Sequence, residues 1–244
     1  MTEPMETREK PNPRTNSLLA KLDSEDYESL LTNCKPVQLK FRKRLFLQDA
    51  SIDAVYFPLT CMVSLLVSTN GHPETEMATI GKEGVVGAAE ASLRRGAFGL
   101  HLIQIGGTAL RISSNNFLAE IKSRPSIATV LQQHQYALTR QILQGAACNR
   151  IHSMEERCAR WILMTHDRAG QDSFPLTQEF LSHMLGVRRA TVNVATGMLK
   201  KAGFVRYVRG QVTVTDRAGL ESASCECYRV IRNIYASALL SPEK

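Results

Sequence analysis

The spacing of hydrophobic and polar residues divides the chain into a strand-rich first part and a helix-rich second part. Helix-like spacing covers residues 17–22 and 25–31. Between about 36 and 113 the chain contains short stretches of β-forming residues separated by Gly, Pro, Asp or Asn–Gly: VQLKF, LFLQ, AVYFPL, MVSLLVS, FGLHLIQI and TALRIS. Many short strands with Gly-rich turns predict a small antiparallel barrel or sandwich.

Helical spacing dominates after residue 113. It predicts a short helix over 114–122, and Pro125 suits the first turn of a long helix that runs to about residue 152. An apolar stripe follows the long helix: Ile127, Leu131, Leu138, Ile142 and Gly145. The stripe packs either against the chain's own strands or against the same helix of a second copy, and the length of the helix favours the second. His134 lies beside the stripe and is interpreted as a packed or interface histidine.

The next segment predicts a helix–turn–helix followed by a hairpin. Helices are expected over 154–167, within PLTQEFLSHMLGV and from Arg188 to about residue 202, with a turn at Gly186. Their apolar positions would form one core: Trp161, Leu163, Phe180, Leu181, Met184, Leu185, Val187, Val192, Ala195, Met198 and Leu199. FVRYV and QVTVT, on either side of Arg209–Gly210, predict a two-stranded hairpin. Helix–turn–helix plus hairpin is the layout of a winged-helix DNA-binding domain.

Arg188 and Arg189 open the second helix of this motif against the usual preference. A helix N-terminus carries partial positive charge, and two exposed arginines there cost roughly 0.3–1 kcal/mol each. An arginine at the start of a recognition helix can bond guanine O6 and N7 together, which is worth about 1–3 kcal/mol of base discrimination. The gain exceeds the cost, so the arginines are interpreted as DNA-reading residues.

Charge supports this interpretation. The chain has a formal net charge of +7, and residues 177–217 hold seven Lys or Arg against two acidic residues, which is +5. A basic chain favours an anionic partner such as nucleic acid. Base or near-phosphate contacts are assigned to Arg188, Arg189 and Asn193. Phosphate contacts are assigned to Thr177, Thr191 and the wing arginines Arg206 and Arg209.

Outside this segment the sequence offers little chemistry. The sequence shows no nucleophile–base set and no spacing typical of metal ligands, and GKEGVVG at 81–87 lacks the Gly-Lys-Ser/Thr ending of a P-loop. Neither enzyme activity, nor a cofactor, nor a metal site is therefore expected. The six cysteines are expected to be buried or free thiols. If Cys225 and Cys227 lie on one helix, they point to different faces and form a poor metal clamp. Asp216 is expected to cap a final helix through about residue 240.

The N-terminus predicts no targeting or membrane segment. Residues 1–16 are polar and contain three prolines, so they are expected to form a disordered tail rather than a signal peptide. No apolar run approaches the length of a membrane span. A cytoplasmic protein is therefore expected.

The order of these parts resembles the Crp/Fnr family of bacterial transcription regulators. The resemblance is strongest in LTQEFLSHMLGVRRATVNVATGMLKKAGFV with its wing, and in IGKEGVVGAAEAS followed by IQIGGTALRIS. It implies an α+β fold with a cyclic-nucleotide-binding-like antiparallel β-roll, a long dimerisation helix and a C-terminal winged helix-turn-helix. The implied divisions are 1–16 (tail), 17–123 (roll), 124–152 (dimerisation helix), 153–216 (winged helix) and 217–244 (C-terminal helical extension).

Departures from the family pattern limit which effector or cofactor the resemblance implies. Cyclic AMP-binding members use a Gly-Glu pair and an Arg-Ser or Arg-Thr pair, whereas this chain has Gly87–Ala88 and Gly96–Ala97–Phe98 there. Cyclic AMP is therefore not the expected effector, although Arg94 and Arg95 lie nearby. No cysteine precedes Cys34, which argues against a cysteine-ligated cluster, and His72 and His101 are read as surface or core histidines rather than haem ligands.

The resemblance implies a DNA-binding transcription regulator that binds a near-palindromic site as a homodimer. Its partners would be double-stranded DNA, a second copy and, through the roll, RNA polymerase, with no membrane partner. Because Ala190 and Val194 replace a glutamate and an arginine of many relatives, their target sequence is not carried over. The alternative is a regulatory or scaffold protein whose roll binds a small ligand or a protein.

Overall fold

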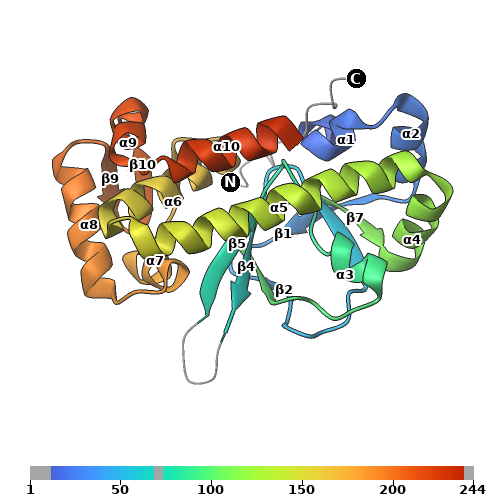
Figure 1. Cartoon of the computed structure of the whole chain (residues 1–244), viewed down its shortest axis with the longest axis horizontal. Coiled ribbons are helices and arrows are strands. Elements are labelled where there is room, and N and C mark those ends of the chain that lie inside the picture. The colour runs from blue at the N-terminus through green and yellow to red at the C-terminus, as the bar shows by residue number, and fades with distance from the viewer. Residues whose placement is uncertain (1–11, 69–73, 239–244) are drawn as a thin grey trace, which may run out of the picture.

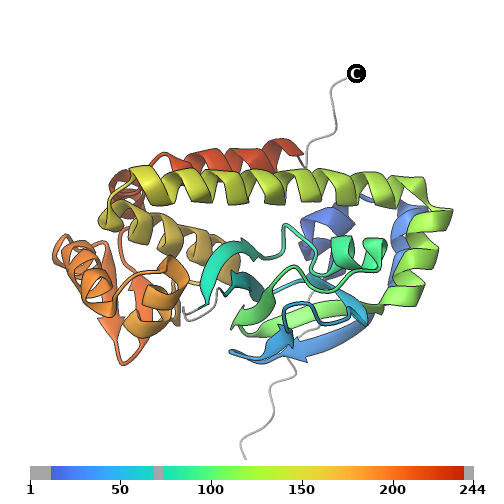
Figure 2. The ribbon, with the colours of Figure 1, turned by 60° about the horizontal axis from the view of Figure 1, so that its bottom comes forward.

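The computed structural model describes residues 12–68 and 74–238 of the 244-residue chain. An antiparallel β-roll occupies one end of the molecule and a helix–turn–helix with a small sheet occupies the other (Figure 1). The long helix α5 (Pro125–Ile151) runs along both parts (Figure 2). The predicted α+β fold class is confirmed.

The chain enters the roll through a buried asparagine. Asn16 was expected to end a disordered tail, yet its side chain is fully buried. Its amide donates to the carbonyls of Pro58 and Gly84, each at 2.9 Å, and its oxygen caps α1 (Ser17–Lys21). A 3-10 turn (Pro13–Thr15) precedes it and α2 (Ser24–Thr32) follows. Residues 12–16 of the expected tail are therefore ordered, and its residues 1–11 lie outside the described part.

Two antiparallel sheets form the roll. One has the order β1–β7–β3, with β1 (Lys35–Leu39), β7 (Gly107–Ser113) and β3 (Ala54–Pro58). The other has the order β2–β6–β4–β5, with β2 (Arg44–Phe46), β6 (Leu100–Ile105), β4 (Met62–Val67) and β5 (Thr75–Ile80). The sequence did not indicate β5, because TEMATI lacks a run of β-formers, nor the short helix α3 (Ala88–Leu93).

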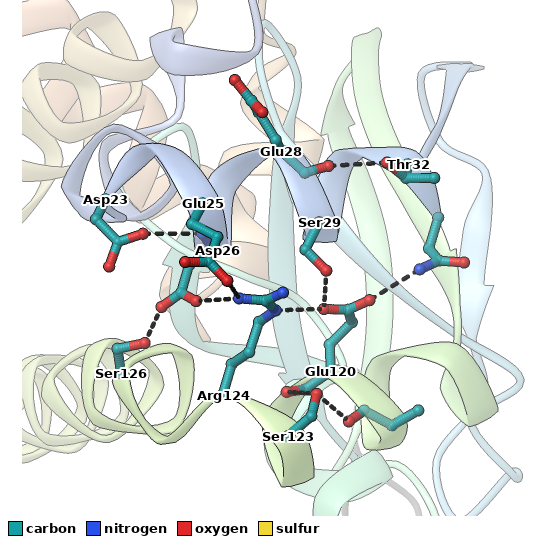
Figure 3. Close-up of polar contacts among 12 residues, drawn as sticks. Asp23, Glu25, Asp26, Glu28, Ser29, Thr32, Glu120, Ser123, Arg124 and Ser126 are labelled. Carbon is teal, nitrogen blue, oxygen red and sulfur yellow. Dashed lines mark hydrogen bonds and ion pairs between the residues drawn. The ribbon is translucent and has the colours of Figure 1, made fainter.

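A polar network joins α2 to the junction between α4 (Ser114–Ser123) and α5 (Figure 3). The carboxylate of Glu120 accepts from the Ser29 hydroxyl at 2.9 Å and from the Asn33 amide at 2.8 Å. Arg124 donates to Asp26 at 2.9 Å, and the Ser126 hydroxyl bonds the same carboxyl group. These contacts fix the start of α5 on the roll.

The predicted apolar stripe of α5 covers the chain's own roll. Ile127 belongs to the core formed with α1, β3 and β7, and Leu138 belongs to the core inside the roll. Leu131 and Ile142 pack against the same cores. Of the two alternatives for this stripe, packing against the chain's own strands is therefore the one that the structure shows, although the sequence favoured pairing. His134 is buried, as expected of a packed histidine.

The second part is a three-helix core with a three-stranded wing. It contains α6 (Met154–Ala169), α7 (Gln178–Leu185) and α8 (Arg189–Lys201). The wing sheet has the order β8–β10–β9, with β8 (Ser173–Pro175), β10 (Gln211–Val214) and β9 (Val205–Val208). The predicted core residues belong to one cluster with Val187 at its edge, except Met198, whose side chain is 44% exposed.

The C-terminal segment forms two helices rather than the one predicted. α9 (Arg217–Ala223), capped by Asp216 as expected, ends at Ser224, whose backbone is extended. Then α10 (Cys227–Ala238) turns back and packs along α5 (Figure 2). The change of direction buries Tyr228, Ile231 and Tyr235, which a straight continuation of α9 would carry away from α5. Residues 239–240 of the predicted helix lie outside the described part.

Across residues 12–68 and 74–238, no helix combines the length and the apolar character that crossing a lipid bilayer requires.

Candidate nucleic-acid interface

The recognition helix begins as the sequence predicts. Gly186 ends α7 in the left-handed conformation, with φ +65°, and this sharp turn redirects the chain into α8. Arg188 occupies the N-cap position without a side-chain cap, and no acidic residue lies in the first turn. The partial positive charge of this helix end is thus reinforced rather than neutralised.

Residues of α8 alternate between the core and the surface at helical spacing. Val192 and Ala195 are buried, whereas Arg189, Thr191 and Asn193 are exposed. Arg189 and Asn193, four positions apart, therefore lie on one side of the exposed surface at the start of α8, and Thr191 lies on the other side. Hydrogen-bonding groups on an exposed helix N-terminus can reach base edges in a major groove.

The wing turn lies beside the start of α7. Arg209 and Gly210 both have positive φ, +47° and +78°, as a two-residue hairpin turn requires. The amide of Leu176 donates to the Gly210 carbonyl at 2.9 Å, so Thr177 adjoins the turn. The Thr177 hydroxyl caps α7 by accepting from the Phe180 amide at 3.1 Å. The structure thus brings Thr177 and Arg209 together at one edge of the motif.

Six of the seven cations counted in this segment are exposed and form no ion pair with a carboxylate in the described residues: Arg188, Arg189, Lys200, Lys201, Arg206 and Arg209. Arg217 differs, because it donates to Asp167 at 2.7 Å and to Glu221 at 2.9 Å. It belongs to the packing of α9 on α6, so the sequence count overstates the available charge by one.

The winged helix rests on the roll through specific contacts. Phe180 of α7 lies 6.2 Å from Phe41, ring centroid to ring centroid. The indole of Trp161 on α6 donates to the Glu76 carboxylate of β5 at 2.7 Å. Burial raises the pKa of Glu76 to about 7, although that hydrogen bond opposes the shift. A titratable group therefore lies in the contact between the two parts.

A cavity of about 310 Å³ lies between the roll and α5. Its lining is largely apolar and contains no Lys or Arg; the polar lining residues are Glu90, Ser92, His101, Gln132, His134 and Gln135. Arg94 and Arg95 are exposed and do not line it. The cavity of the described chain therefore offers no arginine or lysine to a buried phosphate.

His101 is engaged on both sides of its ring. Nδ1 lies 3.1 Å from the Gly99 carbonyl, and Nε2 lies 3.6 Å from the Glu90 carboxylate. Burial lowers the pKa of His101 to about 4. Its place in the packed roll agrees with the expected core histidine. The other histidine considered as a haem ligand, His72, lies outside the described residues.

Comparison by sequence identifies one domain. The family model of the Crp-like helix-turn-helix domain matches residues 156–223, which run from α6 to the end of α9. No curated protein matches the chain.

Comparison by structure extends the similarity to the roll. FixK2 from Bradyrhizobium japonicum is 15% identical with a TM-score of 0.67, over 79% of this chain and 98% of that one. A Crp/Fnr-family transcriptional regulator from Thermus thermophilus is 17% identical with a TM-score of 0.62, over 78% and 98%. The c-di-GMP-responsive global regulator CLP from Xanthomonas campestris is 13% identical with a TM-score of 0.61, over 79% and 99%.

The domain match and the shared architecture agree with the resemblance seen in the sequence. The chain has the fold of the Crp/Fnr family of transcriptional regulators, and its residues 156–223 form a Crp-like helix-turn-helix domain.

Proposed function

We propose that this protein is a homodimeric transcription regulator that binds a near-palindromic DNA site and does not use cyclic AMP. The observation that carries the proposal is the exposed, uncapped and basic N-terminus of α8, where Arg188 and Arg189 have no carboxylate partner among the described residues. Free guanidinium groups at that position cost stability unless an anionic or base partner uses them.

The contacts divide into two classes. Arg188, Arg189 and Asn193 are assigned to base edges or adjacent phosphates, because they lie on the leading turns of the recognition helix. Thr177, Thr191, Arg206 and Arg209 are assigned to the DNA backbone. Base contacts set sequence preference, whereas backbone contacts set register and overall affinity.

Dimerisation is assigned to a face of α5 that neither the roll nor α10 covers. The exposed positions on this face repeat at spacings of four and three: Gln132, Tyr136, Thr139, Leu143, Ala146 and Arg150. Tyr136 and Leu143 are 58% and 60% exposed, which is unusual for large apolar side chains at coiled-coil spacing. Two-fold pairing along this row would place two recognition helices about one DNA turn, roughly 34 Å, apart.

The roll cavity supports the exclusion of cyclic AMP. Without a lysine or arginine in the lining, burial of a cyclic phosphate leaves its charge unpaired. DNA binding is therefore expected in the absence of any cyclic nucleotide.

The test is a selection of bound duplexes from a random DNA library, at near-physiological salt and without added ligand. The proposal expects an enriched palindrome with half-sites about one turn apart. Failure to enrich any sequence, both with purified protein and with cell extract added, would contradict it.

Two variants test the division of roles. Arg189→Ala should change the enriched base at one position of each half-site, which corresponds to about 1–3 kcal/mol of lost discrimination. Arg209→Asn should weaken binding to all duplexes about equally and reduce the salt slope by about one. Arg94→Ala removes an exposed arginine of the roll and serves as the charge-matched control. Identical losses for Arg189→Ala and Arg209→Asn on every duplex would reject the division.

A further inference from the structure

Three cysteines and one histidine from two distant segments of the chain meet beside the end of α5. The group contains Cys148 in the last turn of α5, His152 at its C-cap, Cys225 between α9 and α10, and Cys227 at the start of α10. The three thiols are buried, with exposures of 3% or less. The sequence argument against a metal clamp assumed that Cys225 and Cys227 lie on one helix, and that condition is not met, because Cys225 precedes α10.

We propose that these four side chains form a closed, tetrahedral Zn²⁺ site. All four ligand atoms lie within 4.8 Å of one another. The Sγ atoms of Cys148 and Cys225 are 3.5 Å apart, and Sγ of Cys227 is 3.6 Å from Nδ1 of His152. Zinc–sulfur bonds of about 2.3 Å in a tetrahedron place neighbouring sulfurs about 3.8 Å apart. These two distances thus already match a Cys₃His centre, and the other ligand atoms lie within 4.8 Å of one another.

The surroundings orient these ligands as a metal site requires. Nδ1 of His152 faces the sulfurs, while Nε2 lies 3.2 Å from the Glu226 carboxylate. A carboxylate on the far nitrogen of a ligating histidine fixes its tautomer and increases its basicity. The Gln144 amide donates to Sγ of Cys227 at 3.0 Å, which supports a thiolate there.

The local charge also suits zinc. Zn²⁺ with three thiolates carries a net charge of −1, and two buried arginines stand close by. Arg157 and Arg160 each have an Nε atom without a hydrogen-bond partner in the described residues, and the charge of Arg160 favours the Cys148 thiolate. Three sulfurs and one nitrogen in a tetrahedron select Zn²⁺ over hard cations, and four protein ligands leave no open position for catalysis.

The location gives the site a role in the architecture. Cys148 and His152 adjoin the connection into the helix-turn-helix domain at residue 153, and Cys225 and Cys227 adjoin the connection out of it. Bound zinc would hold both connections to the end of α5. This inference concerns the metal alone and does not depend on DNA binding.

The first measurement is the metal content of the full-length protein, purified under reducing conditions and loaded with Zn²⁺, by elemental mass spectrometry. One zinc per chain is expected for the wild type and for Cys34→Ser, which removes a thiol outside the cluster. Cys227→Ser should lose the zinc. Co²⁺ substitution should give the intense visible bands of tetrahedral thiolate coordination in the wild type and in Cys34→Ser, but not in Cys227→Ser.

A second variant guards against misfolding. Glu226 is 60% exposed in its side chain, so Glu226→Gln should preserve the fold, checked by circular dichroism. It should weaken zinc binding about 10- to 100-fold in competition with a chelator. A wild type without zinc, equal zinc in Cys227→Ser, or iron with inorganic sulfide in place of zinc would overturn the proposal.

Discussion

At the scale of single residues, Glu76 is the clearest conflict between burial and charge. Its carboxyl group is buried between β5 and α6, and Oε2 has no hydrogen-bond partner in the described residues. Burial raises the pKa to about 7 from an ordinary value of about 4.5. In the folded protein the neutral form is therefore favoured, while the unfolded chain ionises at lower pH.

The sign of the resulting pH dependence follows from this shift. Between pH 4.5 and 7 the folded state binds more protons at Glu76 than the unfolded state does, so the contribution of Glu76 to stability falls as pH rises. Glu76→Gln removes the ionisation and keeps an oxygen for the Trp161 indole. The difference in unfolding free energy, variant minus wild type, should therefore increase between pH 4.5 and pH 7.5, by on the order of 3 kcal/mol.

Urea unfolding of both proteins at several pH values measures this difference. Comparing the two proteins cancels the opposite contribution of His101, whose pKa is lowered by burial. A difference that is constant with pH would mean that Glu76 is ionised normally in the folded state.

Residues that break a local rule were the most informative in the sequence. Arg188 and Arg189 were placed correctly because an unfavourable helix start is visible without a structure. Met198 was placed wrongly in the core, since helical spacing cannot separate the edge of an apolar face from its centre. The meeting of Cys148 with Cys225 could not be predicted, because it depends on where α9 ends.

At the scale of elements, the conformation of the wing turn at Arg209 lowers the free energy of unfolding. Arg209 adopts a left-handed conformation that costs a non-glycine residue about 1–2 kcal/mol. It forms no ion pair in the described part of the chain that would compensate. Asparagine tolerates this conformation better and carries no charge.

Arg209→Asn should therefore stabilise the protein by about 0.5–1 kcal/mol while it weakens DNA binding. Chemical denaturation measures the first effect. Arg206→Asn removes the same charge from strand β9, where asparagine is disfavoured, and should lower stability instead. A loss of stability in Arg209→Asn would show that the arginine makes a stabilising contact in solution.

Elements with strong end signals were predicted well. Pro125 and Gly186 mark helix ends by their backbone preferences, and the helices around them have nearly the predicted bounds. Strand β8 was missed because three residues with a proline carry too little pattern. The break at Ser224 was missed because serine is only weakly unfavourable inside a helix, so tertiary contacts of α10 decide it.

At the scale of the whole molecule, α5 has three different faces. One packs on the roll, as Ile127 and Leu138 show, and one packs on α10, where His134 lies 6.4 Å from Tyr235 between ring centroids. The third carries Tyr136 and Leu143 and is exposed. The sequence indicated one stripe, whereas the assembled chain uses two faces internally.

Leu143→Glu tests the exposed face. Glutamate favours helices, so the fold should persist, but a charge in a paired seam should convert the dimer to a monomer and weaken palindrome binding at least tenfold. Light scattering after size exclusion measures the mass. Leu47→Glu, which alters a roll residue of 55% exposure, is the matched control. A dimeric Leu143→Glu protein would place the interface elsewhere.

The return of α10 along α5 changes how the DNA-binding part can move. A domain that is joined to the rest of a protein by a single linker can rotate in many directions around that linker. Here the segment matched by the Crp-like model is joined at residue 153 and again near residue 224, and helices that pack on each other flank both joints. Two neighbouring pivots leave one easy axis of rotation. Any reorientation of the recognition helix is thus a hinge rotation about one axis rather than free movement about a single point.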